Sequence, residues 1–287
     1  KTTDRGTTLE KDGIKIQTSE HVLAALVGMQ IDNCFISMNA SESPIMDGSS
    51  KFFTEAIQKA GVIEQDEKRN EYVVTELISY KCEESGSEIT IMPSENYQVT
   101  TMVDFGTKIL GTQNATLENI SQFKSEIAPS RTFSFLHELE TLLENGLIKG
   151  GDLNNAIVIV DKILEKSKLD QISKMMGRKK VKVEKEGILN NTKLQYNNEP
   201  ARHKLLDIIG DLALVGRPIK GHIIAARPGH KSNIEFAKIL KKSLKSKNIN
   251  APKYDPNQSP VYDINEIKKI INHRYPFLFV DKITYLD

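Results

Sequence analysis

The stretch ARHKLLDIIGDL, residues 201–212, decides how the rest of this chain is interpreted. On a helical wheel of about 100° per residue, His203, Asp207, Asp211 and Lys204 fall at roughly 0°, 40°, 80° and 100°. Most remaining positions are Leu, Ile or Ala, so we predict a helix that is buried on most of its surface and whose polar stripe either faces water or lines a site. His203 and Asp207 are one turn apart, a spacing at which an imidazole and a carboxylate can bind one metal ion. An ordinary His–Asp pair facing water stays open as the alternative.

Composition places the chain among globular proteins. It has 287 residues, a formal net charge of +1 and 39% hydrophobic residues, which indicates about two domains and gives no reason to expect nucleic acid as a partner. Cys34 and Cys82 form no Cys-x-x-Cys motif, so we predict neither a disulfide framework nor a cysteine zinc site, in agreement with a cytoplasmic location. No apolar run reaches the roughly 18 residues of a transmembrane segment. The chain opens without Met or a signal peptide, and we expect a fragment.

The first half of the chain is predicted to mix helices and strands. Thr18 or Ser19 caps a helix through residue 28, with Glu20 and His21 in its first turn, where the helix dipole favours an ionised carboxylate. A second helix is expected at residues 51–60, ended by Gly61. Strands are expected at residues 13–17, 31–38, 72–74, 88–91 and 97–103. The charged stretch 64–70 is typical of a domain boundary.

The second half places one histidine at an element junction. A helix ending at Gly146 and a strand at residues 156–160 precede a lysine-rich stretch, 162–188, which we interpret as a solvated insertion. After the central helix, the strand 221–226 leads into a loop at residues 227–231, and Ser232 and Glu235 form a capping box for the next helix. His230 is therefore expected in a strand-to-helix loop, a common position for chemistry.

Six motifs, in this order, resemble those of the bacterial zinc-dependent UDP-3-O-acyl-N-acetylglucosamine deacetylase family. They are SEHVLAAL (19–26), IDN (31–33), PIMDGS (44–49), SRTF (130–133), RHKLLDIIGD (202–211) and GH (229–230). The resemblance runs from about residue 16 to about residue 245. Six ordered motifs are far more specific than any one of them.

By this resemblance the fold is α+β, with two two-layer α/β sandwich domains whose helices pack between the sheets. The first domain would comprise residues 1–66 and the second residues 67–247, with a Lys-rich insertion at 162–195. The implied activity is zinc-dependent hydrolysis of the acetamide of a UDP-linked acylated glucosamine to the amine and acetate. This reaction is the committed step of lipid A biosynthesis in Gram-negative bacteria.

The resemblance also implies roles for particular residues. His21, His203 and Asp207 would hold Zn²⁺ at the domain interface and leave a fourth position for water, as in catalytic zinc sites. The other implied roles are Glu20 as general base, Thr132 as oxyanion stabiliser, His230 as proton donor or charged stabiliser, Asp211 as the group that orients His230, Lys204 as a contact of the sugar or diphosphate, and Phe133 as a lining of the acyl passage. For Phe133, plain core packing stays open as well.

The end of the chain resembles a different protein. Residues 263–283, DINEIKKIINHRYPFLFVDKI, are similar to the start of a (3R)-hydroxyacyl-acyl-carrier-protein dehydratase, which has a hotdog fold. Residues 248–262 would be a linker and residues 263–287 a truncated dehydratase start, without the catalytic His and Glu of that family. We therefore expect both ends to be cut, no dehydratase activity, and loosely packed apolar side chains at Tyr275, Phe277, Leu278 and Phe279. Acyl carrier protein would be a partner only of the full-length fusion.

Two other functions stay open. The chain could be a truncated fragment that binds metal without turnover, which metal content and a deacetylation assay would separate from the enzyme. It could also be a different zinc amidase on the same scaffold, although the motifs around Thr132, Phe133 and Lys204 argue against that.

Overall fold

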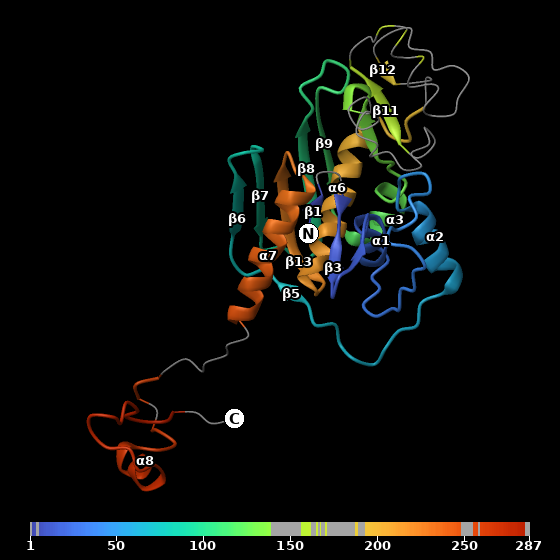
Figure 1. Cartoon of the computed structure of the whole chain (residues 1–287). Coiled ribbons are helices and arrows are strands. Elements are labelled where there is room, and N and C mark those ends of the chain that lie inside the picture. Colours follow the sequence, from blue (N-terminus) through green and yellow to red (C-terminus); the bar gives the residue numbers. More distant parts are fainter. Residues whose placement is uncertain are drawn as a thin grey trace. The chain divides into compact units, whose positions relative to one another are not determined.

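The computed structural model describes residues 2–3, 6–138, 156–161, 165, 167, 170, 187–188, 193–247, 255–257 and 259–284. The chain divides into two compact units, Lys1–Lys242 and Ser243–Asp287 (Figure 1). Sheets and helices mix in the larger unit, so the predicted α+β class is confirmed. The proposed boundary between residues 66 and 67 stays a prediction. The expected helix end at Gly146 and most of the insertion and linker lie outside the described residues.

A six-stranded sheet forms the centre of the larger unit. Its strand order is β6 (Ile78–Cys82), β7 (Ser87–Met92), β13 (Ile219–Ala226), β8 (Tyr97–Asp104) and β9 (Thr112–Leu117), and β5 (Tyr72–Val73) also pairs with β13. β13 runs parallel to β8 and antiparallel to β7. Buried residues alternate with more exposed ones along β7, β8 and β13, which is the pattern of a sheet with one covered face.

Helix α6 (Glu199–Leu212) packs on the large sheet, and helix α1 (Glu20–Gly28) packs on α6. α6 contacts β8 and β9 on one side and α1 on another. The prediction that α6 is buried over most of its surface is confirmed, and Arg202 and Lys204 are its only residues that are not buried. The polar stripe is not an exception as a whole, because His203, Asp207 and Asp211 are buried with the apolar residues. The two helices approach closely because Gly210 has no side chain: a Cβ there would lie 2.1 Å from the carbonyl oxygen of Glu20. This contact brings the first turn of α1 against α6.

A smaller sheet carries a separate apolar cluster. β10 (Phe133–Phe135) is parallel to β11 (Ile157–Val160), which is antiparallel to β12 (Gly187–Ile188). Buried Leu110, Ile157 and Ile159 form the cluster, and Phe105, Ile109, Phe133, Phe135, Ile188 and Leu194 pack against it. The strand predicted at residues 156–160 is thus confirmed as β11.

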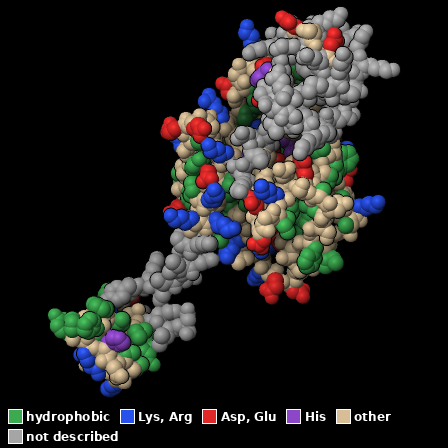
Figure 2. Space-filling model, in the orientation of Figure 1, with side chains coloured by type: hydrophobic (Ala, Val, Ile, Leu, Met, Phe, Trp, Pro, Cys, Tyr) green, Lys and Arg blue, Asp and Glu red, His purple; other side chains and the backbone are tan. Residues whose placement is uncertain are grey.

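The remaining elements are two short ribbons and several helices. They are β1 (Thr2–Thr3), β2 (Gly6–Thr7), β3 (Leu9–Lys11), β4 (Ile14–Ile16), α2 (Lys51–Ala60), η1 (Ile120–Gln122), α3 (Phe123–Glu126), η3 (Ala213–Val215), α7 (His230–Lys247) and α8 (Ile264–Ile270). β1 pairs with β2, and β3 with β4. None of the described helices is long and apolar enough to cross a membrane. On the face of the larger unit in Figure 2, basic and acidic side chains are interspersed.

Two predictions of local structure are wrong. Residues 31–38 form no strand, and Phe35 and Ile36 are exposed. A strand needs a partner for its backbone hydrogen bonds, and the described part of the chain supplies none there. The expected loop at residues 227–231 ends earlier, because the Gly229 carbonyl accepts from the N–H of Asn233 at 2.8 Å and starts α7 at His230. Ser232 consequently lies inside the first turn and does not cap the helix.

The smaller unit contains α8 and an exposed apolar segment. The side chain of Asp263 caps α8 by accepting from the N–H groups of Asn265 and Glu266. Tyr275, Phe277 and Phe279 are exposed as predicted, whereas Leu278 is half-buried. Figure 2 shows hydrophobic side chains gathered on this unit. Its described residues hold no strand beyond an isolated bridge, so the hotdog start stays a prediction.

Candidate metal centre and its surroundings

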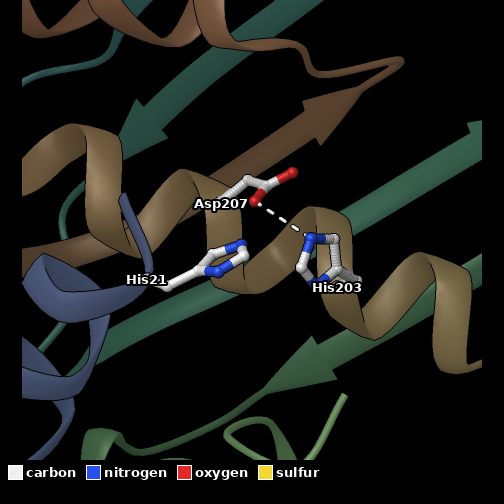
Figure 3. A group of neighbouring side chains, drawn as sticks. All are labelled: His21, His203 and Asp207. Atoms are coloured by element: carbon white, nitrogen blue, oxygen red, sulfur yellow. Dashed lines mark ion pairs between the residues drawn. The ribbon is translucent and has the colours of Figure 1, made fainter. Parts of the chain in front are cut away.

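Two histidines and an aspartate meet in a buried cluster between α1 and α6. His21 is the second residue of α1, and His203 and Asp207 are one turn apart on α6. One candidate ligand atom of each lies within 4.8 Å of those of the other two, and all three residues are buried. Figure 3 shows His21 reaching from α1 toward the two side chains of α6. The His–Asp pair predicted from the helical wheel therefore faces the interior and not water.

Atoms without partners indicate that this cluster can hold an ion. Asp207 Oδ1 and His21 Nδ1 are buried without a hydrogen-bond partner, which costs about 1–3 kcal/mol for each unsatisfied polar group. His203 Nε2 lies 3.4 Å from Asp207 Oδ1, close enough for an ion pair but without hydrogen-bond geometry. The Nδ1–H of His203 donates to the carbonyl of Ser130 at 3.1 Å, which leaves the Nε2 lone pair for the cluster. A divalent cation would satisfy these atoms.

The protonation states of the three residues also fit a metal site. Burial, reinforced by His203, lowers the pKa of His21 to about 3, and burial lowers the pKa of His203 as well. Burial by itself raises the pKa of Asp207, but its interactions with His203, Lys204 and His230 outweigh burial and hold that pKa well below its usual range. Neutral imidazoles and an ionised carboxylate are the forms that bind metal. Two His and one carboxylate, with a fourth position for water, make a set that Zn²⁺ accepts.

Glu20 places a second carboxyl group beside the cluster. It is the first residue of α1, next to His21, and it is buried. The backbone N–H of Thr7 donates to Glu20 Oε2 at 2.9 Å. Burial raises the pKa of Glu20 to about 7, against the lowering effect of His230. A carboxyl group with a pKa near neutrality can take up and release a proton at working pH.

Asp211 holds His230 at the edge of the cluster. The Nδ1–H of His230 donates to Asp211 Oδ2 at 3.0 Å, and His230 Nε2 lies 3.8 Å from Asp207 Oδ2. Asp211 is completely buried and also accepts from Asn233 Nδ2 at 2.8 Å and from Thr7 Oγ1 at 2.5 Å. Burial by itself lowers the pKa of His230, but Asp207 and Asp211 outweigh burial and raise that pKa to about 9. These two carboxylates therefore favour the protonated form of His230.

Lys204 and Phe133 border the cluster on the side of the smaller sheet. Lys204 Nζ donates to Asp207 Oδ2 at 3.3 Å and lies 5.6 Å from the centre of the Phe133 ring. The Phe133 ring is edge-on to His203, with centroids 6.4 Å apart, and also packs against the apolar cluster of β10 and β11. Phe133 is half-buried, so it both packs in a core and borders the site.

Thr132 is held by its backbone immediately before β10. Its N–H donates to the Gly48 carbonyl at 2.7 Å, and its carbonyl accepts from the N–H of Ile157 at 2.8 Å. These bonds fix the chain next to Phe133. The role of the Thr132 hydroxyl stays a prediction.

Sequence reasoning missed several supporting residues. Ser50 Oγ donates to the carbonyl of His21 at 2.7 Å, and Thr7 and Asn233 bind the carboxylates described above. Ser130, whose carbonyl accepts from His203, is the first residue of the motif SRTF, and its place in that motif is its only sequence signal. The others act through partners that are distant in sequence, which local spacing does not reveal.

The chain is similar to proteins named as deacetylases. A family model described as UDP-3-O-acyl N-acetylglycosamine deacetylase matches residues 1–175 and 171–242. The bifunctional enzyme LpxC/FabZ of Bacteroides thetaiotaomicron is 46% identical over 281 residues, which cover 98% of this chain and 61% of the relative. The protein of the same name from Chlorobaculum tepidum is 45% identical over 284 residues, with the same coverage. The UDP-3-O-acyl-N-acetylglucosamine deacetylase of Thermodesulfovibrio yellowstonii is 38% identical over 239 residues, covering 83% of this chain and 73% of the relative. The chain thus spans about three fifths of the length of the bifunctional relatives.

Proposed function

This chain belongs to the UDP-3-O-acyl-N-acetylglucosamine deacetylase family, and on that premise we propose that it catalyses zinc-dependent hydrolysis of the acetamide of UDP-3-O-acyl-N-acetylglucosamine. The products are the free amine and acetate, and the reaction is the committed step of lipid A biosynthesis in the cytoplasm. One observation carries the proposal: a buried His–His–Asp cluster lies beside the buried carboxyl group of Glu20 and beside His230, which Asp211 holds by a hydrogen bond.

Glu20 acts as the general base. When bound to His21, His203 and Asp207, the ion supplies Lewis acidity that polarises the acetamide carbonyl and makes the attacking water more acidic. Glu20 takes the proton of that water as it attacks. The carboxyl of Glu20 is suited to this step because burial raises its pKa and the Thr7 N–H holds one of its oxygens.

His230 delivers the proton that the leaving amine needs. Its Nε2 is directed toward the cluster, while Asp211 binds Nδ1, sets the tautomer and favours the charged form. The Thr132 hydroxyl stabilises the negative oxygen that develops during the attack. Both roles come from the matching motifs of the family, and the contacts of His230 support the first.

Lys204 and Phe133 bind the substrate. The ammonium group of Lys204 is half-buried beside the cluster and suits the sugar or the diphosphate. Phe133 connects the site with the apolar cluster of the smaller sheet, which suits the acyl chain. Residues 263–287 lie mostly within the alignment with the bifunctional relatives, which supports their assignment to the start of a dehydratase domain. Acyl carrier protein is then a partner of the full-length protein.

Acetate release from the UDP-linked substrate by the full-length protein tests the proposal. Glu20→Ala is expected to lower kcat by about 10²–10⁴-fold with metal content unchanged. Glu55→Ala, at a half-exposed position on α2, is the matched control and is expected to keep the wild-type rate. Metal-loaded protein without turnover would favour the alternative of a metal-binding fragment, and an unaffected Glu20→Ala enzyme would refute the assigned base.

A further inference from the structure

We propose that Thr7 is a positioning residue that ties the carboxylate of Glu20 to the Asp211–His230 pair. The inference rests on the proposed function and concerns a residue outside all six motifs. Thr7 would thereby fix the position of Glu20, which accepts the proton of the water, relative to His230, which donates a proton to the leaving amine.

Thr7 hydrogen-bonds both carboxylates at once. Its backbone N–H donates to Glu20 Oε2 at 2.9 Å, and its hydroxyl donates to Asp211 Oδ1 at 2.5 Å. The side chain is completely buried. One residue of β2 therefore joins the first turn of α1 to the end of α6.

Thr7 is itself held in place. Its carbonyl accepts from both the N–H and the hydroxyl of Ser19, at 3.2 Å and 3.1 Å. The neighbouring Gly6 lies directly against the Glu20 carboxyl, because a Cβ on Gly6 would be 3.0 Å from Oε1. All three polar groups of Thr7 are thus used, each toward a different residue at or beside the site.

The Thr7 hydroxyl fixes the orientation of the Asp211 carboxylate group. Oδ1 accepts from Thr7, while Oδ2 accepts from His230 Nδ1 and Asn233 Nδ2. Without the hydroxyl, Oδ1 would be a buried acceptor with no donor and the carboxylate could rotate away from His230. Because Thr7 is completely buried and its polar groups are all bound by Glu20, Asp211 and Ser19, its loss should act on the proton-transfer steps and not on substrate binding.

Thr7→Val tests this, because valine keeps the shape and the backbone N–H but has no hydroxyl. In the full-length protein we expect kcat to fall about 10–100-fold, with KM within about threefold of wild type and metal content unchanged. Thr7→Ser retains the hydroxyl and should recover the rate to within about threefold. Thr54→Val is the matched control, since Thr54 is a buried threonine whose hydroxyl donates to the Lys51 carbonyl within α2. It should leave kcat unchanged.

The same substitution in a His230→Ala background separates positioning from general damage. If Thr7 acts through Asp211 and His230, Thr7→Val should change the residual rate there by less than about twofold. An equal loss in both backgrounds would overturn the inference, and so would a fall in kcat matched by a fall in folded, metal-loaded protein. If Thr7→Val keeps the wild-type kcat while Glu20→Ala and His230→Ala each lower kcat strongly, only the role of Thr7 is overturned. A wild-type protein without turnover would overturn the proposed function with it.

Discussion

Replacing Gly210 with alanine tests whether the closeness of α1 and α6 builds the site. The new Cβ would lie 2.1 Å from the carbonyl oxygen of Glu20, 2.8 Å from its carbonyl carbon and 3.0 Å from its Cα. A carbon and an oxygen in contact normally lie about 3.3–3.6 Å apart, so the helices must separate locally by about 1 Å. All the clashing atoms belong to the backbone, and no change of rotamer can relieve the contact.

The substitution should damage activity far more than stability. Alanine is favoured over glycine within a helix by about 1 kcal/mol, whereas overpacking costs about 1–3 kcal/mol. The net destabilisation is then at most about 2 kcal/mol, or roughly 4–8 °C in Tm. The turn that moves carries both Glu20 and His21. A misplacement of about 1 Å in a catalytic group costs on the order of 10²-fold in rate.

Three measurements on the full-length Gly210→Ala protein check this reasoning. They are metal affinity by competition with a chelator, kcat/KM for acetate release, and Tm. We expect weaker metal binding, kcat/KM reduced about 10²-fold and a modest fall in Tm. Gly229→Ala is the matched control, because a Cβ at Gly229 meets nothing within 4 Å although the residue adjoins His230. If Gly210→Ala retains the metal affinity and kcat/KM of this control, the close approach of the helices does not set the site.

Three further predictions follow from the same contacts. Asp207→Ala should weaken metal binding strongly, because three protein ligands become two, and unchanged affinity would contradict the ligand set. The pH dependence of kcat/KM should be bell-shaped, because the rate falls as acid protonates Glu20 and as base deprotonates His230. A bound cation lowers the pKa of both groups, so the acidic limb should lie at or below about pH 7 and the basic limb at or below about pH 9. Glu20→Ala should remove the acidic limb, and His230→Ala should remove the basic limb. Arg131→Ala should lower the free energy of unfolding, measured in urea, by about 3–5 kcal/mol, because it leaves the completely buried Glu199 carboxylate without its cation. A loss below about 1 kcal/mol would show that the Arg131–Glu199 ion pair does not stabilise the fold.

The local elements were largely predictable. The helices at residues 20–28 and 51–60, the end of the latter at Gly61 and the strands β7, β8 and β13 agree with the sequence pattern. Each depends on side-chain periodicity and on turn or capping residues, which act over a few positions. The wrong strand at residues 31–38 was predicted from the same kind of local pattern. An alternation of apolar and polar residues shows that a segment could bury one face as a strand, but not that a neighbouring strand is there to pair with it.

The candidate site was predictable only in part. The motifs pointed to His21, His203, Asp207, Glu20 and His230, and the structure brings all five together. Their roles stay predictions. The start of α7 at His230 was missed because a backbone bond from Asn233 to Gly229 decided it, while Ser232 and Glu235 suggested a later start. Local capping signals compete with other contacts, and His230 and Asn233 in this first turn both bind Asp211, which lies on another helix.

The sequence by itself determined which side chains share a face of α6, because the pitch of a helix places His203 and Asp207 one turn apart in any environment. Only the tertiary structure decided that this face is buried against α1, since that depends on a close approach at Gly210 that no local pattern encodes. Only the tertiary structure could bring Thr7 to Asp211, which lies 204 residues away along the chain. The energy of such a contact comes from packing and desolvation between distant segments, and sequence spacing carries no information about either.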